Sequence, residues 1–179
     1  MRKEKSLSIY SYYENGGNVV CPWLKWREIM INITLKQIDE SNFLDCFQLE
    51  LKESQKEFVS HPIRSLAQAY VYYNQCTPYG IYHDNKMVGY VMVIYDYDES
   101  TYNIWHLMID KKQQGKGYGR LAMQRVLDVI RSKPFGDSNT VLLTCNPDNK
   151  TAYNLYQSLG FTETGHKDEE EVEMSYVLR

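Results

Sequence analysis

The sequence predicts one domain of the α/β or α+β class. Its 179 residues fall within the usual size of a single domain, ~100–200 residues. Along residues 30–179, apolar positions recur either every second residue, which is typical of strands, or at the spacing of a helix. Read in order, these patterns predict four strands, a helix, a strand, a helix and at least one closing strand, interrupted early by two short helices.

The elements follow from local signals. Ile33 and Leu35 alternate with polar residues, as in a half-buried strand. Ser41 is the expected N-cap of a first helix, whose apolar residues continue to Leu51. His61-Pro62 is expected to break that helix. The expected elements are a strand from Met30, a helix from Ser41, a short helix over 65–73, a hairpin over 79–95 with its turn at 84–85, a strand over 102–110, a helix over 118–131, a strand over 140–145, a helix over 149–159, and one or two closing strands from Phe161.

Residues 1–29 differ from the rest of the chain, because their apolar residues do not recur at the spacing of a strand or a helix. Met30 is a candidate natural start, which would make these residues a mis-assigned leader. The alternative is a short accessory segment that packs its Tyr and Trp side chains on the domain. The predicted organisation is therefore an N-terminal extension of unknown role over 1–29 and a domain over 30–179.

Composition excludes several classes of protein. The formal charge of −3 argues against nucleic acid as the main partner, because phosphate binding needs a basic surface. No apolar run is long enough to cross a membrane, and no apolar signal-peptide core follows the basic start. The four cysteines are far apart without a C-x-x-C pair, which favours reduced thiols, no metal site and a cytoplasmic protein.

The most informative stretch is the glycine-rich turn over 113–119. A strand runs into Gly115, Gly117 and Gly119, and these open a helix. Glycines permit positive φ, and a helix N-terminus presents unpaired N–H groups and the positive end of its dipole. Lys116 and Arg120 add positive charge, so the turn is expected to bind an anion such as a pyrophosphate.

Two common phosphate-binding motifs do not match this turn. No Gly-Lys pair here is followed by Ser or Thr, as the P-loop requires. The dinucleotide fingerprint G-x-G-x-x-G would need glycine at 120, where Arg120 stands. A tight strand-to-helix turn without a ligand is the remaining structural alternative.

With this turn, the sequence resembles the GNAT superfamily of acetyl-CoA-dependent N-acyltransferases. The family's pyrophosphate loop, [RQ]-x-x-G-x-[GA], is matched by Gln114, Gly117 and Gly119. A second block, N-x-x-A-x-x-L-Y-x-x-x-G-F, follows a strand that ends at Cys145, in the order the family has. Its residues are Asn149, Ala152, Leu155, Tyr156, Gly160 and Phe161. The resemblance covers about residues 31–178.

The resemblance implies a GNAT-like fold, with a central, mixed, mostly antiparallel sheet of six to seven strands flanked by four helices. It implies acetyl-CoA as the cofactor and leaves a homodimer open. Softer likenesses at 79–82, 88–90 and 104–110 are closest to bacterial spermine/spermidine (diamine) acetyltransferases. The implied cofactor-binding residues are Leu107, Met108, Ile109, Gln114, Gly115, Lys116, Gly117, Tyr118, Gly119, Arg120, Asn149, Ala152 and Tyr156.

Two residues are candidates for the proton transfers. Tyr156 matches the family tyrosine that protonates the leaving thiolate, and a phenol of pKa ~10 suits that task; the alternative is a core aromatic. His106 on the central strand is a candidate base for the amine, directly or through water, and a satisfied structural histidine is the alternative. Cys145 is interpreted as a strand cysteine, because direct transfer is the superfamily's usual route.

Acidic residues are candidates for binding a cationic acceptor. Asp96, Asp98 and Glu99 precede the central strand and are expected at the mouth of the site, with a solvated turn as the alternative. Residues 30–100 contain ten acidic and five basic residues, which gives slight support. The run 168–173 is expected to cap a surface turn between the closing strands.

Together these observations predict an enzyme that transfers the acetyl group of acetyl-CoA directly to a primary amine of a small cationic acceptor, a polyamine or diamine. Two alternatives stay open. In the first, the acceptor is a protein N-terminus, a lysine, an amino acid or an aminoglycoside. In the second, the chain is a non-catalytic acyl-CoA-binding module.

Overall fold

The structure is a computed structural model and describes residues 32–179. The predicted extension over 1–29, its boundary at Met30 and its two interpretations lie outside the described residues. The described chain forms β1 (Ile33–Gln37), α2 (Phe43–Phe47), η1 (Glu53–Gln55), α3 (Pro62–Val71), β2 (Cys76–His83), β3 (Lys86–Asp96), β4 (Thr101–Ile109), α4 (Tyr118–Arg131), β5 (Thr140–Cys145), α5 (Lys150–Leu159), β6 (Thr162–Asp168) and β7 (Glu171–Val177).

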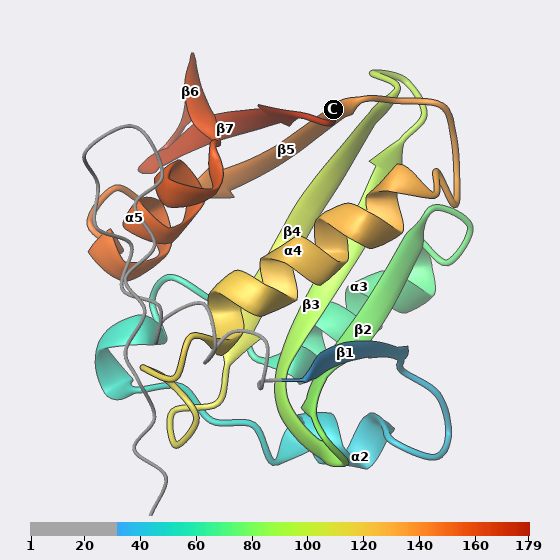
Figure 1. The fold of residues 1–179 in the computed structure, drawn as a ribbon, viewed down its shortest axis with the longest axis vertical. Coiled ribbons are helices and arrows are strands. Elements are labelled where there is room, and N and C mark those ends of the chain that lie inside the picture. The colour runs from blue at the N-terminus through green and yellow to red at the C-terminus, as the bar shows by residue number, and fades with distance from the viewer. Residues whose placement is uncertain (1–31) are drawn as a thin grey trace, which may run out of the picture. The chain divides into compact units, whose positions relative to one another are not determined.

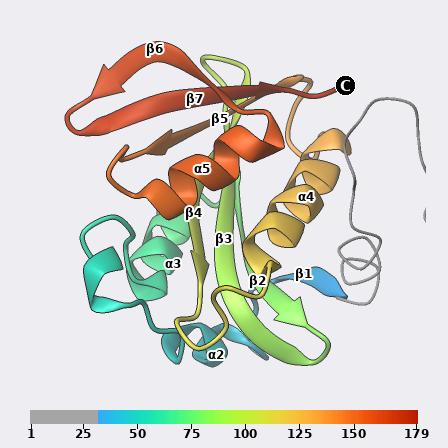
Figure 2. The same cartoon turned by 60° about the vertical axis from the view of Figure 1, so that its left-hand side comes forward.

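The seven strands of residues 32–179 form one sheet in the order β1-β2-β3-β4-β5-β7-β6 (Figure 1). Helices α2 and α3 pack on one face against β2 and β3, and α4 packs on the other face, with α5 beside it (Figure 2). Every strand pair is antiparallel except β4 with β5. The mixed, mostly antiparallel sheet with four α-helices confirms the predicted fold class.

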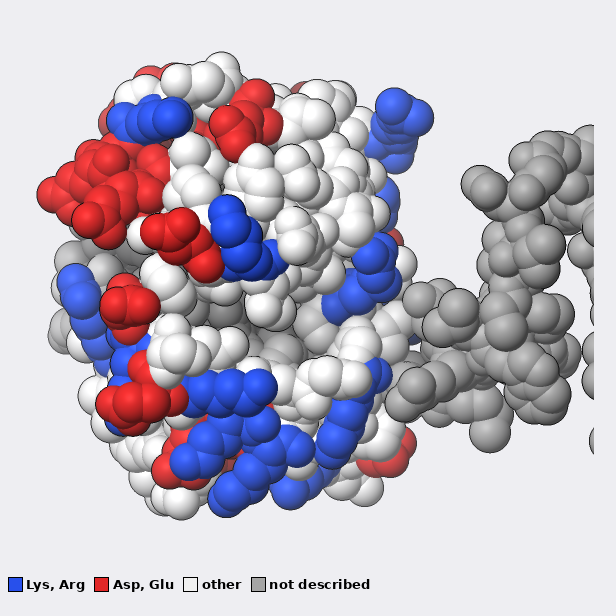
Figure 3. All heavy atoms as spheres, turned by 90° about the vertical axis from the view of Figure 1, so that its left-hand side faces the viewer, with Lys and Arg blue, Asp and Glu red and all other residues white. Residues whose placement is uncertain are grey.

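The parallel pair β4–β5 is very short. Only Tyr102 with Val141 and Asn103 with Leu142 are paired. Beyond them the two strands separate toward the left-hand side of Figure 1, which is the side that faces the viewer in Figure 3. One edge of β4 after Asn103 is therefore without a strand neighbour in the described chain.

A β-bulge interrupts β4 on its other edge. Met92 pairs with His106 while Val93 pairs with Ile104, so Trp105 is the extra residue. Because successive strand residues point to opposite faces, the bulge turns His106 to the face opposite Ile104. His106 thereby faces α3, where its ring nitrogen Nε2 lies 3.0 Å from Oε1 of Gln68.

The first two helices differ from the prediction. Helix α2 ends at Phe47, and Leu51 lies outside it. The backbone N–H and carbonyl of Glu50 bond instead to the Asp110 carboxylate (3.0 Å) and to the Lys111 N–H (2.7 Å). The predicted N-cap is also wrong, because the hydroxyl of Ser41 donates to Oδ1 of Asp39 (2.6 Å).

Pro62 begins a helix rather than only ending one. It occupies the first turn of α3, where a missing N–H costs nothing, and Nδ1 of His61 accepts the N–H of Ile63 at 3.2 Å. The predicted helix over 65–73 therefore starts three residues earlier. Within residues 32–179 no helix combines the length and the apolar character needed to cross a bilayer.

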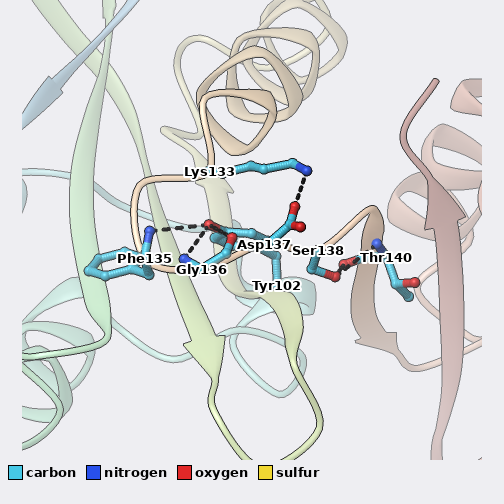
Figure 4. A network of polar contacts seen from close by, with 7 residues as sticks. All are labelled: Tyr102, Lys133, Phe135, Gly136, Asp137, Ser138 and Thr140. Carbon is cyan, nitrogen blue, oxygen red and sulfur yellow. Dashed lines mark hydrogen bonds and ion pairs between the residues drawn. The ribbon is translucent and has the colours of Figure 1, made fainter.

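A buried tyrosine anchors the connection between α4 and β5 (Figure 4). The hydroxyl of Tyr102 donates to the carbonyl of Gly136 (2.9 Å) and accepts the N–H groups of Phe135 (3.2 Å) and Gly136 (3.1 Å). A Cβ at Gly136 would lie 2.4 Å from the ring of Tyr95, so this turn has no room for a side chain. An ion pair between Lys133 and Asp137 closes the same loop. The loop is thus attached to β4 at the point where β4 and β5 pair.

We expect Tyr102→Phe to lower the free energy of unfolding by about 1–3 kcal/mol, because it leaves buried backbone groups of 135–136 without their partner. Urea unfolding followed by circular dichroism measures the change. The control is Tyr97→Phe, since the Tyr97 side chain is exposed and its hydroxyl has no hydrogen-bond partner in the described chain. Equal stability of the two variants would contradict this role.

Candidate active site

The glycine turn between β4 and α4 exposes a row of backbone donors. Gly115 and Gly117 have φ values of 77° and 87°, and a Cβ on either would meet nothing within 4 Å. Backbone conformation, not crowding, therefore requires glycine there. Within residues 32–179, the N–H groups of 114–120 have no hydrogen-bond acceptor. They surround the N-terminus of α4, which favours an anion.

Two cations flank this turn, as predicted, but each already has a polar contact. The ammonium of Lys116 donates to Oε1 of Gln113 at 2.7 Å. The guanidinium of Arg120 donates to Oγ of Ser158 at 2.5 Å and so connects α4 to α5. Tyr118 is buried and stacks on His83, with ring centroids 4.9 Å apart. The turn therefore combines a positive electrostatic environment with a firmly placed helix N-terminus.

A cavity of about 540 Å³ lies between this turn, the end of β4 and the first turns of α5. The structure brings together at this cavity almost all the residues that the resemblance assigns to the cofactor. Those lining it are Leu107, Met108, Ile109, Gln114, Gly115, Gly117, Tyr118, Gly119, Arg120, Asn149, Ala152 and Tyr156. Lys116 does not line it, although Gln113, to which its ammonium donates, does.

The side chain of Gln114 bonds to the end of β4 and to η1. Its Nε2 donates to the carbonyl of Ile109 (2.9 Å) and to Oε1 of Gln55 (2.8 Å). Asn149 has a second function as well, since its Oδ1 accepts the N–H of Ala152 (3.3 Å) and caps α5.

A second cavity, of about 340 Å³, adjoins the first. The two share Leu107, Asn149, Ala152, Tyr156 and Val59 as lining residues. The further lining of the second cavity comes from β4, the end of β5, the segment before α3, α3 itself and the start of β7. It includes Phe58, Ser60, Gln68, His106, Thr144, Cys145, Asn146 and Glu171.

Tyr156 lies on α5 at the junction of the two cavities. Its side chain is buried, packs near Phe161 (ring centroids 6.0 Å apart), and its hydroxyl has no hydrogen-bond partner in the described chain. Burial, and secondarily Cys145 and Glu171, raises the pKa of the phenol above its ordinary value. The phenol is therefore protonated at neutral pH and can donate that proton.

His106 satisfies both interpretations of the sequence at once. It has a side-chain partner in Gln68, and it lines the second cavity. Burial, with a smaller contribution from the charge of Arg64, lowers its pKa to about 4. The imidazole is consequently neutral at pH 7.

Cys145 lies at the end of β5 and lines the second cavity. Burial, and then the charge of Glu171, raises the pKa of its thiol to about 11. Its Sγ lies 3.4 Å from the carbonyl of Asn146. A thiol with this pKa is almost entirely protonated at neutral pH, which is unsuited to nucleophilic attack.

Asp96, Asp98 and Glu99 do not lie at the mouth of the site, contrary to the prediction. They form the turn between β3 and β4, where Oδ1 of Asp96 accepts the N–H groups of Asp98 (2.9 Å) and Glu99 (3.0 Å). None of them lines either cavity. The reason is strand length: from Thr101 to Leu107 β4 extends about 20 Å, so its two ends lie far apart.

The carboxylate that does line the second cavity is Glu171, within the acidic run that was expected only to cap a turn. It is half-buried and accepts a hydrogen bond from the hydroxyl of Thr144. The next residue, Val172, pairs with Cys145, so the start of β7 lies beside the end of β5. The signal in the sequence was the acidic run 168–173, but the position of this run in the fold depends on strand order. Figure 3 shows acidic side chains gathered at the upper left of this face and basic ones in the lower half.

Comparison with protein families finds one match. The family described as "Acetyltransferase (GNAT) family" matches residues 42–161. A search of curated proteins finds no match.

Solved structures share the fold at low sequence identity. A spermidine N-acetyltransferase from Vibrio cholerae, in complex with CoA and spermine, has a TM-score of 0.65 at 18% identity, over 81% of this chain and 95% of that one. An acetyltransferase from Salmonella typhimurium that modifies the N-terminal serine of ribosomal protein L7/L12 has 0.67 at 17%, over 82% and 95%. The PaiA N-acetyltransferase from Thermoplasma acidophilum, in complex with coenzyme A, has 0.63 at 12%, over 82% and 99%.

The family match covers most of the chain, includes the glycine turn and Tyr156, and agrees with the fold and the two adjoining cavities. The chain thus belongs to the acetyltransferase (GNAT) family and is an acetyl-CoA-dependent N-acetyltransferase.

Proposed function

We propose that this enzyme transfers the acetyl group directly to a primary amine of a small cationic acceptor, a polyamine or diamine. The observation that carries this proposal is the lining of the second cavity. Among the described residues that line it, Glu171 has a carboxylate and none is Lys or Arg. Since His106 is neutral, the formal charge of this lining is negative, which favours a cation. We therefore assign the second cavity to the acceptor and name it the acceptor cavity.

The first cavity fits acetyl-CoA, and we name it the cofactor cavity. Its N–H groups over 114–120, which have no acceptor within residues 32–179, suit a pyrophosphate together with the N-terminus of α4 and Arg120. The open edge of β4 at Leu107–Ile109 offers backbone groups to the pantetheine arm and to the carbonyl that must be polarised. When bound, acetyl-CoA supplies the thioester whose acyl group is transferred.

Tyr156 is the proposed acid. It lies where the cofactor cavity meets the acceptor cavity, and its hydroxyl is free to donate within the described chain. The departing thiolate of coenzyme A must gain a proton, and a phenol that is protonated at neutral pH can donate one. Surroundings with little water strengthen the hydrogen bond from the phenol to the thiolate.

His106 is the proposed proton acceptor for the amine, through water. An alkylammonium of pKa ~10 is a much weaker acid than an imidazolium of pKa about 4, so a proton on His106 would be held weakly. We therefore propose that His106 orients the amine or a water and passes the proton on to solvent, rather than storing it. The Gln68 side chain fixes the ring for this task.

The comparisons support amine acceptors without selecting one. The solved neighbours include a spermidine enzyme and an enzyme that modifies a protein N-terminus, so an N-terminal amine is the second candidate acceptor. Glu171 favours the small cation. The homodimer and the cytoplasmic location stay predictions, and sedimentation of the purified chain and fractionation of its source cells test them.

Tyr156→Phe is expected to lower kcat for acetylation of spermidine by about 10²–10³-fold, because the leaving thiolate loses its acid. Affinity for acetyl-CoA should stay within about twofold. Thiol release measures turnover, and titration calorimetry measures affinity. Tyr153→Phe is the matched control on the same helix, since its exposed hydroxyl bonds to Glu163 away from both cavities. Unchanged turnover of Tyr156→Phe would show that Tyr156 is not the acid.

Glu171→Gln is expected to raise KM for spermidine about tenfold, because a charge-assisted contact of ~1.5 kcal/mol is lost. KM for a neutral-tailed monoamine should change little. Glu170→Gln is the control: that carboxylate is exposed, contacts Asn146 at 3.4 Å and does not line the acceptor cavity. A similar effect of both substitutions on KM would argue against a specific role of Glu171.

The lowered pKa of His106 predicts the acid limb of the pH profile. The active neutral form is complete above about pH 5 and is lost as pH falls through about 4. At saturating amine, kcat should therefore show no step near pH 6.5 that belongs to His106. Measurement of kcat from pH 5 to 8.5 in the wild type and His106→Gln checks this. A step near 6.5 that disappears in the variant would refute the low pKa.

A further inference from the structure

We propose that Gln55 is a positioning residue whose hydrogen bond to Gln114 couples the glycine turn to the wall of the acceptor cavity, so that cofactor and acceptor bind cooperatively. The proposal rests on the assignment of the two cavities under the proposed function. It concerns residues 50–60, which we name the wall segment.

The wall segment has little regular structure of its own. It contains the three-residue η1 and a few local turns, such as the Phe58 N–H bonded to the Gln55 carbonyl at 3.1 Å. It nevertheless lines both cavities. Leu51 and Gln55 line the cofactor cavity, Phe58 and Ser60 line the acceptor cavity, and Val59 lines both. Its position therefore determines the shape of both sites.

All polar contacts of the wall segment with the rest of the described chain go to residues 110–114. At one end, Glu50 bonds to Asp110 and Lys111 through its backbone and pairs with the ammonium of Lys111 (3.0 Å) and, more loosely, of Lys112 (3.9 Å). In the middle, Oε1 of Gln55 accepts from Nε2 of Gln114 at 2.8 Å. The wall is thus attached to the segment that leads into the glycine turn.

The direction of the Gln55–Gln114 bond is determined by its neighbours. Nε2 of Gln114 also donates to the carbonyl of Ile109 (2.9 Å), which can only accept. Oε1 of Gln55 also accepts the backbone N–H of Lys52 (3.3 Å), which can only donate. Both amides therefore have one orientation. Gln114 belongs to the glycine turn, and Gln55 is three residues from Phe58, so the bond joins the two sites by a short path.

An anion on the turn orders residues 114–120, including the backbone of Gln114. Through the Gln55 bond this ordering extends to the wall segment, and an acceptor that binds afterwards loses less conformational freedom. The coupling is reciprocal, so the acceptor should raise the affinity for coenzyme A by the same factor.

The test uses the full chain, coenzyme A and spermidine. Coenzyme A is expected to slow hydrogen exchange of the backbone amides in 50–60 in the wild type, and Gln55→Leu should remove most of that protection. The apparent affinity for spermidine measured with bound coenzyme A should fall about three- to tenfold in Gln55→Leu. The affinity for coenzyme A alone should change less.

Two comparisons isolate the bond. Gln124→Leu makes the same substitution at an exposed position of α4 that lines neither cavity, and it should behave as the wild type. In a Gln114→Leu background, Gln55→Leu should have no additional effect on the coupling, because the bond is already absent. Additive effects of the two substitutions would overturn the proposal.

The failures can be told apart. If coenzyme A binds and protects 50–60 equally in the wild type and Gln55→Leu, the coupling is wrong and the proposed function stands. If coenzyme A binds and the coupling is seen, but no amine is acetylated, the proposed acceptor is wrong and the coupling stands. If coenzyme A does not bind, both are wrong.

Discussion

The early separation of β4 from β5 is the constraint on which the rest of the site depends. The two strands pair over only Tyr102 and Asn103, and the loop attached to the Tyr102 hydroxyl holds them together there. Beyond that point the backbone groups along one edge of β4 have no strand partner in the described chain. Both cavities lie along this edge. A fully paired sheet would have satisfied these groups and left no room for an acyl donor beside an amine.

Burial at this opening determines the protonation of three groups together. It raises the pKa of Tyr156 and Cys145 and lowers that of His106. Each group is therefore neutral at pH 7, which suits an acid, an inert thiol and a weak proton acceptor. Glu171, which is half-buried, is the carboxylate among the described residues that line the second cavity. Under the proposed function, an amine that enters the second cavity meets the neutral side chains of Tyr156, Cys145 and His106 and the carboxylate of Glu171. This arrangement favours direct transfer over a covalent intermediate on Cys145.

The sequence-based predictions were accurate where an element is delimited by residues near it in the chain, and wrong where its end depends on distant residues. Helix α4 over 118–131 and strand β5 over 140–145 were predicted to the residue, because a glycine turn and Pro134-Phe135-Gly136 delimit them locally. The first helix was predicted too long, because its end depends on Asp110 and Lys111, about 60 residues away. The local sequence does not show that Glu50 forms hydrogen bonds to distant residues instead of continuing the helix.

The amino-acid sequence by itself determined the half of the site that we propose for the cofactor. The glycines with positive φ, the cap at Asn149 and the position of Tyr156 are all properties of short segments. Only the tertiary structure decided the half that we propose for the acceptor. Strand order places β7 beside β5 and brings Glu171 to the acceptor cavity, while the length of β4 removes Asp96, Asp98 and Glu99 from it. The physical reason is that a binding pocket for a second substrate is assembled from segments distant in the chain, whose approach depends on packing and strand register rather than on local conformation.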